Sequence, residues 1–219
     1  MQVHLKGNHF RLLARLLKEG WERLEGFITE GLDVIRVHVS CAVVINGGYL
    51  AAVKGLGSRT TLAVATESDV RRRSLLKQQY PTALIAADAR SALACAVDVH
   101  VLIVTWPCQP YSSSHRIIYT VAHQRRCQHN TALLVETLLR VCSSIHPPLL
   151  VLIENVPGFV EREASAECCV WLAPEMRELL YQWHEEIICP ATHMRGPQMR
   201  KRFYCVGTLQ ALTTDLEYT

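Results

Sequence analysis

The sequence lacks the features that mark membrane and secreted proteins. No apolar run among its 219 residues reaches the roughly 18 residues that a membrane-spanning helix needs. The N-terminus, MQVHLKGNHFRLLARLLKEG, lacks the basic and then apolar layout of a secretory signal. Internal repeats and low-complexity linkers are also missing. We therefore expect an intracellular protein that forms a single domain and does not contact a membrane.

The cysteines lack the spacing of a disulfide framework or a zinc site. There are nine of them, an odd number without regular spacing, and no CxxC pair occurs. Cys168 and Cys169 are adjacent, which does not suit a structural zinc site. Many unpaired thiols are typical of a reducing compartment, so we expect a protein of the cytosol or nucleus that holds no metal.

The composition is that of a folded domain. Apolar residues make up 49% of the chain and charged residues 20%, which excludes disorder as the main state. The formal net charge is +3. A weakly basic chain suits an anionic partner such as a nucleic acid, although many enzymes carry a similar charge.

Strand-like runs alternate with helical patterns along the chain. Such alternation indicates an α/β fold, a mostly parallel sheet with helices on both faces. We expect an N-terminal helical segment over 1–33, an α/β core over 34–219, and one domain over 1–219. The predicted strands cover 34–45, 61–69, 83–89, 99–107, 148–156 and 202–209, and the predicted helices 10–28, 49–57, 70–81, 131–142 and 173–185.

Polar residues follow the predicted strands directly. Parallel α/β sheets bind ligands at the carboxyl ends of their strands. Five residues fall there, each after an apolar run: Gly47, Glu67, Asp88, Cys108 and Glu154. This edge of the sheet is therefore the predicted active site.

Three short segments carry the predicted chemistry. In TWPCQPYSSS, Cys108 stands between two prolines, which stiffen the loop that presents its thiol. In LIENVPGF, Glu154 ends an apolar strand, where a carboxyl group can donate a proton near neutral pH. In GPQMRKRFYCVG, Gln198, Arg200 and Arg202 occupy alternate positions and can converge on one anionic or planar ligand.

Together and in this order, the three segments resemble the cytosine carbon-5 methyltransferase family. The resemblance rests on Pro107-Cys108-Gln109, Glu154-Asn155-Val156 and Gln198-x-Arg200-x-Arg202, and it covers roughly residues 35–208. It implies a Rossmann-like fold that uses S-adenosyl-L-methionine and an enzyme that methylates carbon 5 of cytosine in DNA.

The resemblance also implies roles for the site residues. Cys108 is the nucleophile that adds to carbon 6 of the base, and Glu154 is the acid at ring nitrogen 3. Arg202 holds the base and Arg200 the neighbouring backbone. The remaining expected contacts to the substrate are Pro107, Gln109, Ser112, Asn155 and Gln198. A base inside a duplex has to be flipped out before such chemistry.

The same resemblance places the cofactor. Gly47 and Gly48 match the end of the family's glycine-rich turn, although Ile45 stands where the family has a glycine. Glu67 matches the acid that pairs with the ribose hydroxyls, and Asp88 the acid near the adenine. Asn8 lies in a Gly-Asn pair before a helix, which resembles the family's last motif moved to the N-terminus, as in circularly permuted members.

Two departures keep other functions open. The family has a Ser-x-x-Gly loop after the nucleophile, but here His115 follows Ser114. We also expect this chain to lack the family's target-recognition region, which would follow Gly207. We therefore expect DNA as the main partner and a second polypeptide that supplies target recognition, in the nucleus of a eukaryote or otherwise in the cytoplasm. The alternatives are an RNA cytosine methyltransferase, a catalytically silent methyltransferase-like subunit, and a hydrolase that uses Cys108 with His115 or His123.

Overall fold

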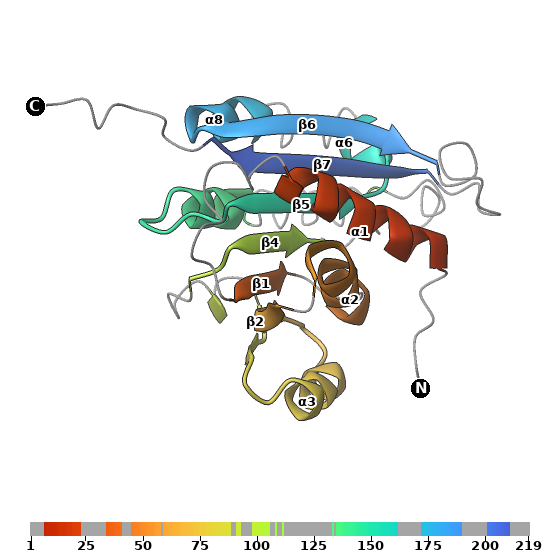
Figure 1. Cartoon of the computed structure of the whole chain (residues 1–219), viewed down its shortest axis with the longest axis vertical. Helices are drawn as coiled ribbons and strands as arrows, with labels where there is room; N and C mark the ends of the chain where they lie inside the picture. Colours follow the sequence, from red (N-terminus) through yellow and green to blue (C-terminus); the bar gives the residue numbers. More distant parts are fainter. Residues whose placement is uncertain are drawn as a thin grey trace, which may run out of the picture.

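The computed structural model describes twelve stretches of the chain: residues 7–22, 34–40, 45–57, 59–88, 91–92, 98–105, 108, 111, 133, 135–161, 172–189 and 201–210. Its strands join in one seven-stranded sheet with the order β3-β2-β1-β4-β5-β7-β6 (Figure 1). The strands are β1 (Ile35–Ser40), β2 (Thr60–Thr66), β3 (Leu84–Ala86), β4 (Val101–Val104), β5 (Leu150–Asn155), β6 (Tyr181–Ile188) and β7 (Arg202–Leu209).

The sheet is parallel from β3 to β5 and antiparallel beyond it. β1 pairs with β2 and β4, β2 pairs with β3, and β4 pairs with β5, all in parallel. β7 is antiparallel to both β5 and β6. The first five strands thus follow the 3-2-1-4-5 order of a doubly wound Rossmann sheet, with a β6-β7 pair at the far edge. The predicted mostly parallel α/β fold is confirmed.

Apolar side chains cover both faces of the central strands. On β5, Leu150 and Leu152 pack into one core cluster, whereas Val151 and Ile153 pack into another on the opposite face. This is the pattern of strands buried on both sides, because successive side chains point to opposite faces. Burial on both faces therefore explains the unbroken apolar runs from which these strands were predicted.

Two helices lie side by side over the first face. They are α1 (Gly7–Glu22) and α2 (Ile45–Leu56), and Figure 1 shows α1 crossing β5 and β7 beside α2. Gly55 permits this packing, because a Cβ atom there would overlap the carbonyl oxygen of Ala14 in α1. The helix predicted from residue 10 is confirmed as far as Glu22, and residues 23–28 lie outside the described part.

The start of α2 differs from the prediction. The sequence predicts a strand that ends at Ile45 and a helix that begins at Tyr49, but residues 45–48 form the first turn of the helix. β1 ends at Ser40. The helix closes as predicted: Gly57, with φ of 90°, donates its N–H to the carbonyl of Val53. Glycine adopts this left-handed conformation without a steric cost.

The helix predicted over 173–185 is wrong in its second half. The helix α8 covers only Leu172–Glu178, and the chain then turns into β6. Leu180 occupies the turn with φ of 64°, which is uncommon for a residue with a side chain. Along β6, buried Tyr181 and Trp183 alternate with exposed Gln182 and His184, so the period of two outweighs the helix propensity of the segment.

The other predicted elements are correctly placed: β7 has its predicted range, whereas β2, β3, β4 and β5 are shorter than predicted. The helix α3 (Val70–Gln79) follows β2, and residues 135–142 are helical. A short helix α6 (Gly158–Glu161) follows β5. None of the described helices could cross a membrane, and the described residues contain no group of three His, Cys, Asp or Glu side chains that could hold a metal.

His100 connects β4 to β1 and makes stability depend on pH. Its Nδ1 accepts the backbone N–H of Arg36 at 3.0 Å, and the backbone N–H of His100 donates to the carbonyl of Arg36 at 2.9 Å. Burial lowers the pKa of His100, Arg36 lowers it further, and Asp98 acts in the opposite direction. Protonation would also remove the acceptor that the Arg36 N–H uses.

The resulting stability is present above the unfolded-state pKa of about 6.5 and is lost as the pH falls through the lower folded-state pKa. We expect urea unfolding to give a smaller free energy of unfolding at pH 5 than at pH 8. His100→Asn keeps an acceptor near the position of Nδ1 but does not titrate, so its loss between these two pH values should be smaller. Equal losses in both proteins would contradict this role of His100.

Candidate active site

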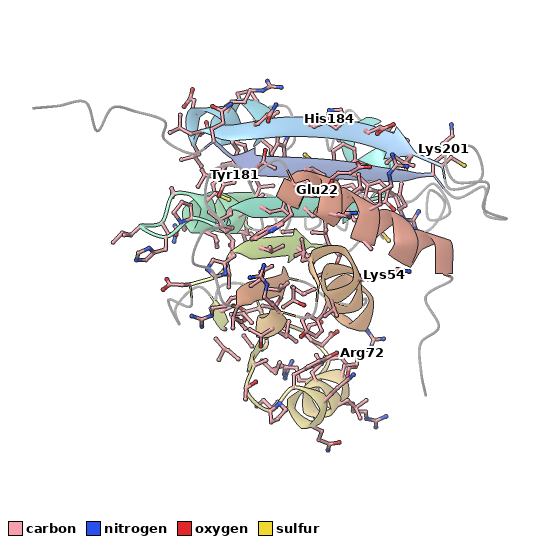
Figure 2. All side chains as sticks on the ribbon, in the orientation of Figure 1. Glu22, Lys54, Arg72, Tyr181, His184 and Lys201 are labelled. Carbon is pink, nitrogen blue, oxygen red and sulfur yellow. The ribbon has the colours of Figure 1, made fainter. Side chains whose placement is uncertain are left out.

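The strand ends bring the predicted site residues to one edge of the sheet. The register pairs Val104 at the end of β4 with Ile153 of β5, so Cys108, beyond β4, and Glu154, near the end of β5, lie at the same edge. Glu67 follows β2 at this edge, and α2 begins there after β1. The arrows of β1 and β4 in Figure 1 point toward this edge. Figure 2 labels two residues on the same side: Lys201, which precedes Arg202, and Arg72, which follows Glu67 by five residues.

Glu154 and Arg202 form a nearly buried ion pair. Arg202 Nε lies 2.8 Å from Glu154 Oε1, and the two side chains are 10% and 12% exposed. Glu154 is opposite Tyr204 in the β5-β7 ladder, so Arg202 is its diagonal neighbour on the same face. Arg202 also donates from Nη1 to the carbonyl of Lys201 at 3.0 Å. The sequence predicted both residues for the site, and the fold brings them into contact.

Cys108 lies beyond β4 in a short turn. Its carbonyl accepts the N–H of Tyr111 at 3.0 Å, and its side chain, half-buried, packs against the core cluster beneath the site. The other described cysteines are Cys142, Cys189 and Cys205, and all three are buried. A thiol has to be reachable to act as a nucleophile, so Cys108 is the candidate among the described cysteines.

Glu67 is a buried carboxylate with one oxygen available to a ligand. The residue is 4% exposed, and Oε1 accepts the N–H of Asp69 at 2.9 Å. Among the described residues, Oε2 receives no hydrogen bond, because Arg72 Nη1, at 3.9 Å, is too far away. A buried acceptor of this kind requires a donor. Ribose hydroxyls would supply one, so Glu67 fits the cofactor contact implied by the resemblance.

The loop after β2 is held by its own polar contacts. Arg73 Nη1 donates to the carbonyls of Glu67 and Ser68 at 2.7 and 2.6 Å. Asp69 is the N-cap of α3, and its carboxylate accepts the backbone N–H of Arg72. This hydrogen bond lowers the pKa of Asp69. Sequence reasoning missed the role of Asp69 in orienting Glu67, although an Asp before a helix is a recognisable N-cap.

The remaining residues that were predicted to contact the cofactor differ in how they are placed. Asp88 is exposed beyond β3, and its carboxylate accepts the N–H of Ser91 at 2.8 Å, as a helix cap would. Gly47 and Gly48 lie in the first turn of α2, where backbone N–H groups point away from the helix toward the site edge. Asn8 is in the first turn of α1, and its side chain lies outside the described part of the structure.

Asn155 points away from Glu154. Side chains alternate along β5, and Asn155 lies opposite Phe203 on the other face, with 0% exposure. Its Oδ1 accepts the N–H of Val156 at 2.8 Å, and its Nδ2 has no partner among the described residues. Two groups of predicted site residues lie outside the described part of the structure. They are four substrate contacts, Pro107, Gln109, Ser112 and Gln198, and one catalytic residue, Arg200.

The structure resembles known methyltransferases. It matches an S. pombe Dnmt2 methyltransferase with a TM-score of 0.54 and 19% identity, covering 80% of this chain and 49% of that one. The Entamoeba histolytica methyltransferase EhMeth gives 0.58 and 17%, covering 84% and 55%. The chain thus spans about half the length of these proteins, and the likeness shows that it shares their Rossmann-like fold.

The sequence comparison is more specific. The type II methyltransferase M.MspI of Moraxella sp is 28% identical over 110 residues, which cover 50% of this chain and 24% of that enzyme. The pattern of the family described as "C-5 cytosine-specific DNA methylase" matches residues 47–218, well over half of the chain. The matched region contains Glu67, Cys108, Glu154 and Arg202, and on this evidence the chain belongs to the C-5 cytosine-specific DNA methylase family.

Proposed function

We propose that this chain transfers a methyl group from S-adenosyl-L-methionine to carbon 5 of cytosine in DNA through a covalent bond to Cys108. The observation that carries the proposal is the ion pair of Glu154 and Arg202, beside the strand that leads to the Cys108 turn. A carboxyl group and a guanidinium on one face can grip the edge of a pyrimidine. A half-exposed thiol beyond the neighbouring strand can approach carbon 6.

Cys108 and Glu154 act first in the proposed reaction. The Cys108 thiolate forms a bond to carbon 6, and Glu154 gives a proton to ring nitrogen 3, which makes carbon 5 nucleophilic. S-adenosylmethionine supplies an electrophilic methyl group on a sulfonium. Carbon 5 takes the methyl group as the bond from that group to the sulfonium sulfur breaks, which leaves a neutral thioether. Solvent then takes the proton of carbon 5, the ring double bond re-forms as Cys108 leaves as the thiolate, and ring nitrogen 3 returns its proton to Glu154. Arg202 holds the Glu154 carboxyl group throughout, and Arg200 and Gln198 would contact the substrate nearby.

A trapping experiment tests this function. Fluorine at carbon 5 cannot leave as a proton, so duplex DNA containing 5-fluorocytosine should remain covalently attached to the chain when S-adenosylmethionine is present. The same base in RNA separates a DNA enzyme from an RNA enzyme. Attachment to DNA supports the proposal, whereas attachment to RNA alone favours the RNA alternative. The absence of both, with cofactor bound, favours a silent subunit.

Glu67 offers a test of the cofactor site. Glu67→Gln keeps the shape and the Oε1 acceptor for Asp69 but replaces a charged acceptor by a neutral amide. Hydrogen bonds to charged groups contribute about 1.5–3 kcal/mol, so the Kd for S-adenosylmethionine should rise by roughly 10- to 100-fold. Calorimetry measures this change. Arg72→Met, which removes only the distant cation, is the control and should leave the Kd nearly unchanged. Unchanged affinity in Glu67→Gln would place the ribose elsewhere.

We further propose that site selection on DNA needs a second polypeptide. Arg202 is committed to Glu154 and can supply pocket contacts, which carry little sequence information. The chain alone should therefore bind duplex DNA weakly, with marked salt dependence and little site preference. Fluorescence anisotropy with several duplexes at low and moderate salt measures this. Robust, site-selective binding by the chain alone would contradict it. A DNA substrate would place the protein in the nucleus of a eukaryote.

A further inference from the structure

We propose that Tyr111, Phe159 and Phe203 form an aromatic brace that positions the Cys108 turn against the strand ends that carry Glu154 and Arg202. The three rings touch in series, and each is attached to a different part of the site. They are positioning residues, because they act through Cys108 and the ion pair. This inference rests on the proposed function, since positioning matters only if Cys108 and Glu154 act on one base.

The three rings are in contact inside the core. The centroids of Tyr111 and Phe159 are 5.1 Å apart with an interplanar angle of 85°, an edge-to-face contact. Those of Phe159 and Phe203 are 6.0 Å apart at 37°. All three residues are buried, Phe159 completely. Contacts between buried aromatic rings at such distances are favourable, so each ring restricts the position of its neighbour.

Each ring is tied to one chemical group of the site by a short backbone path. Tyr111 donates its N–H to the carbonyl of Cys108 at 3.0 Å, which closes the nucleophile turn. Phe159, the second residue of α6, donates its N–H at 2.9 Å to the carbonyl of Val156, which lies two residues beyond Glu154. Phe203 follows Arg202 in β7. The aromatic brace therefore connects three segments that are far apart in the sequence.

The sheet positions only two of the three reacting groups. The β5-β7 ladder fixes Glu154 and Arg202 relative to each other. Cys108 lies four residues beyond Val104, the last residue of β4 in the ladder, so strand pairing does not set its distance from Glu154. Its side chain packs on the same core cluster that contains the three rings. The aromatic brace supplies the connection that the ladder lacks.

Two brace variants and two controls test this assignment in the full 219-residue chain. Phe159→Leu removes the central ring, and Tyr111→Leu removes the ring nearest Cys108 with less disturbance of the core. Tyr111→Phe keeps the ring. Met176→Ala opens the same core cluster in α8, at the opposite end of the sheet from α6 (Figure 1).

The aromatic brace predicts a selective loss of rate. A misplacement of about 1 Å can cost 10²-fold, so both leucine variants should lower kcat by roughly 10- to 100-fold. The Kd for S-adenosylmethionine should stay within about 2-fold. Tyr111→Phe should retain kcat, and Met176→Ala should retain it at a similar loss of thermal stability. If Phe159→Leu does not fold, Tyr111→Leu alone decides. Unchanged kcat in a folded leucine variant, or an equal loss in Met176→Ala, overturns the proposal.

Alkylation of Cys108 tests the aromatic brace without any methyl transfer. Iodoacetamide labelling, followed by peptide mass mapping, distinguishes Cys108 from the other eight cysteines. A loosened turn should expose the thiol, so both leucine variants should react roughly 3- to 10-fold faster, as local opening predicts, and Met176→Ala should not. A wild-type chain that never methylates would refute the proposed function. The alkylation rate of Cys108 would still test whether the aromatic brace positions the turn. Equal labelling rates in all variants would refute the brace alone.

Discussion

Cys108→Ser is expected to reduce both methyl transfer and 5-fluorocytosine trapping to background. The substitution keeps the size of the side chain but replaces the thiol by a hydroxyl, which is a weak nucleophile at neutral pH without a dedicated base. Binding of S-adenosylmethionine should be retained, since Glu67 and α2 are unchanged. Gel separation under denaturing conditions detects the trapped adduct, and transfer of a labelled methyl group gives the rate.

Cys142 provides the matched control for this substitution. It is buried, and burial raises its pKa to about 12, so its thiolate is not populated at neutral pH. Cys142→Ala should therefore retain trapping and methyl transfer, with a modest loss of thermal stability from the small cavity. Trapping that survives Cys108→Ser would assign the nucleophile to another cysteine and remove the basis for the proposed mechanism.

The strand ends of the site could be predicted from the sequence because their cause is local. The apolar runs before Glu67, Cys108 and Glu154 are strands buried on both faces, and such runs end where the chain reaches the polar edge of the sheet. A polar residue directly after such a run therefore lies at that edge. The apolar run after Arg202 likewise predicts β7, which begins at Arg202 as expected.

The long-range contacts could not be predicted, because they depend on register. The contact between Glu154 and Arg202 exists because β5 and β7 are antiparallel and pair Glu154 with Tyr204. The alternation of strands and helices in the sequence predicts a parallel sheet, and that prediction does not include the antiparallel pairing of β5 with β7. The turn at Leu180 likewise kept β6 from being predicted. A residue with a side chain adopts a φ of 64° because of tertiary packing, and nothing in the sequence signals it. The contacts of the aromatic brace are equally non-local.

Glu154→Gln is expected to lower the rate of methyl transfer by about 10²–10⁴-fold, the usual contribution of a positioned acid. Glutamine still offers an oxygen to Arg202 Nε, which lies 2.8 Å from Glu154 Oε1 in the structure, but it has no proton to give to the base. The affinity for S-adenosylmethionine should change little, because Glu67 follows a different strand. Single-turnover kinetics with saturating cofactor measure the chemical step.

A second variant separates catalysis from stability. Glu154→Gln leaves a nearly buried guanidinium without its counterion, which should cost about 1–3 kcal/mol in the free energy of unfolding. Adding Arg202→Met removes the unpaired charge, and replacing both partners of a buried pair is often close to neutral. The double variant should therefore recover most of the lost stability, measured by urea unfolding, and stay as inactive as Glu154→Gln. A double variant that recovers activity together with stability would show that Glu154 serves only to hold the strand ends in place, and would leave Cys108 without its proposed acid.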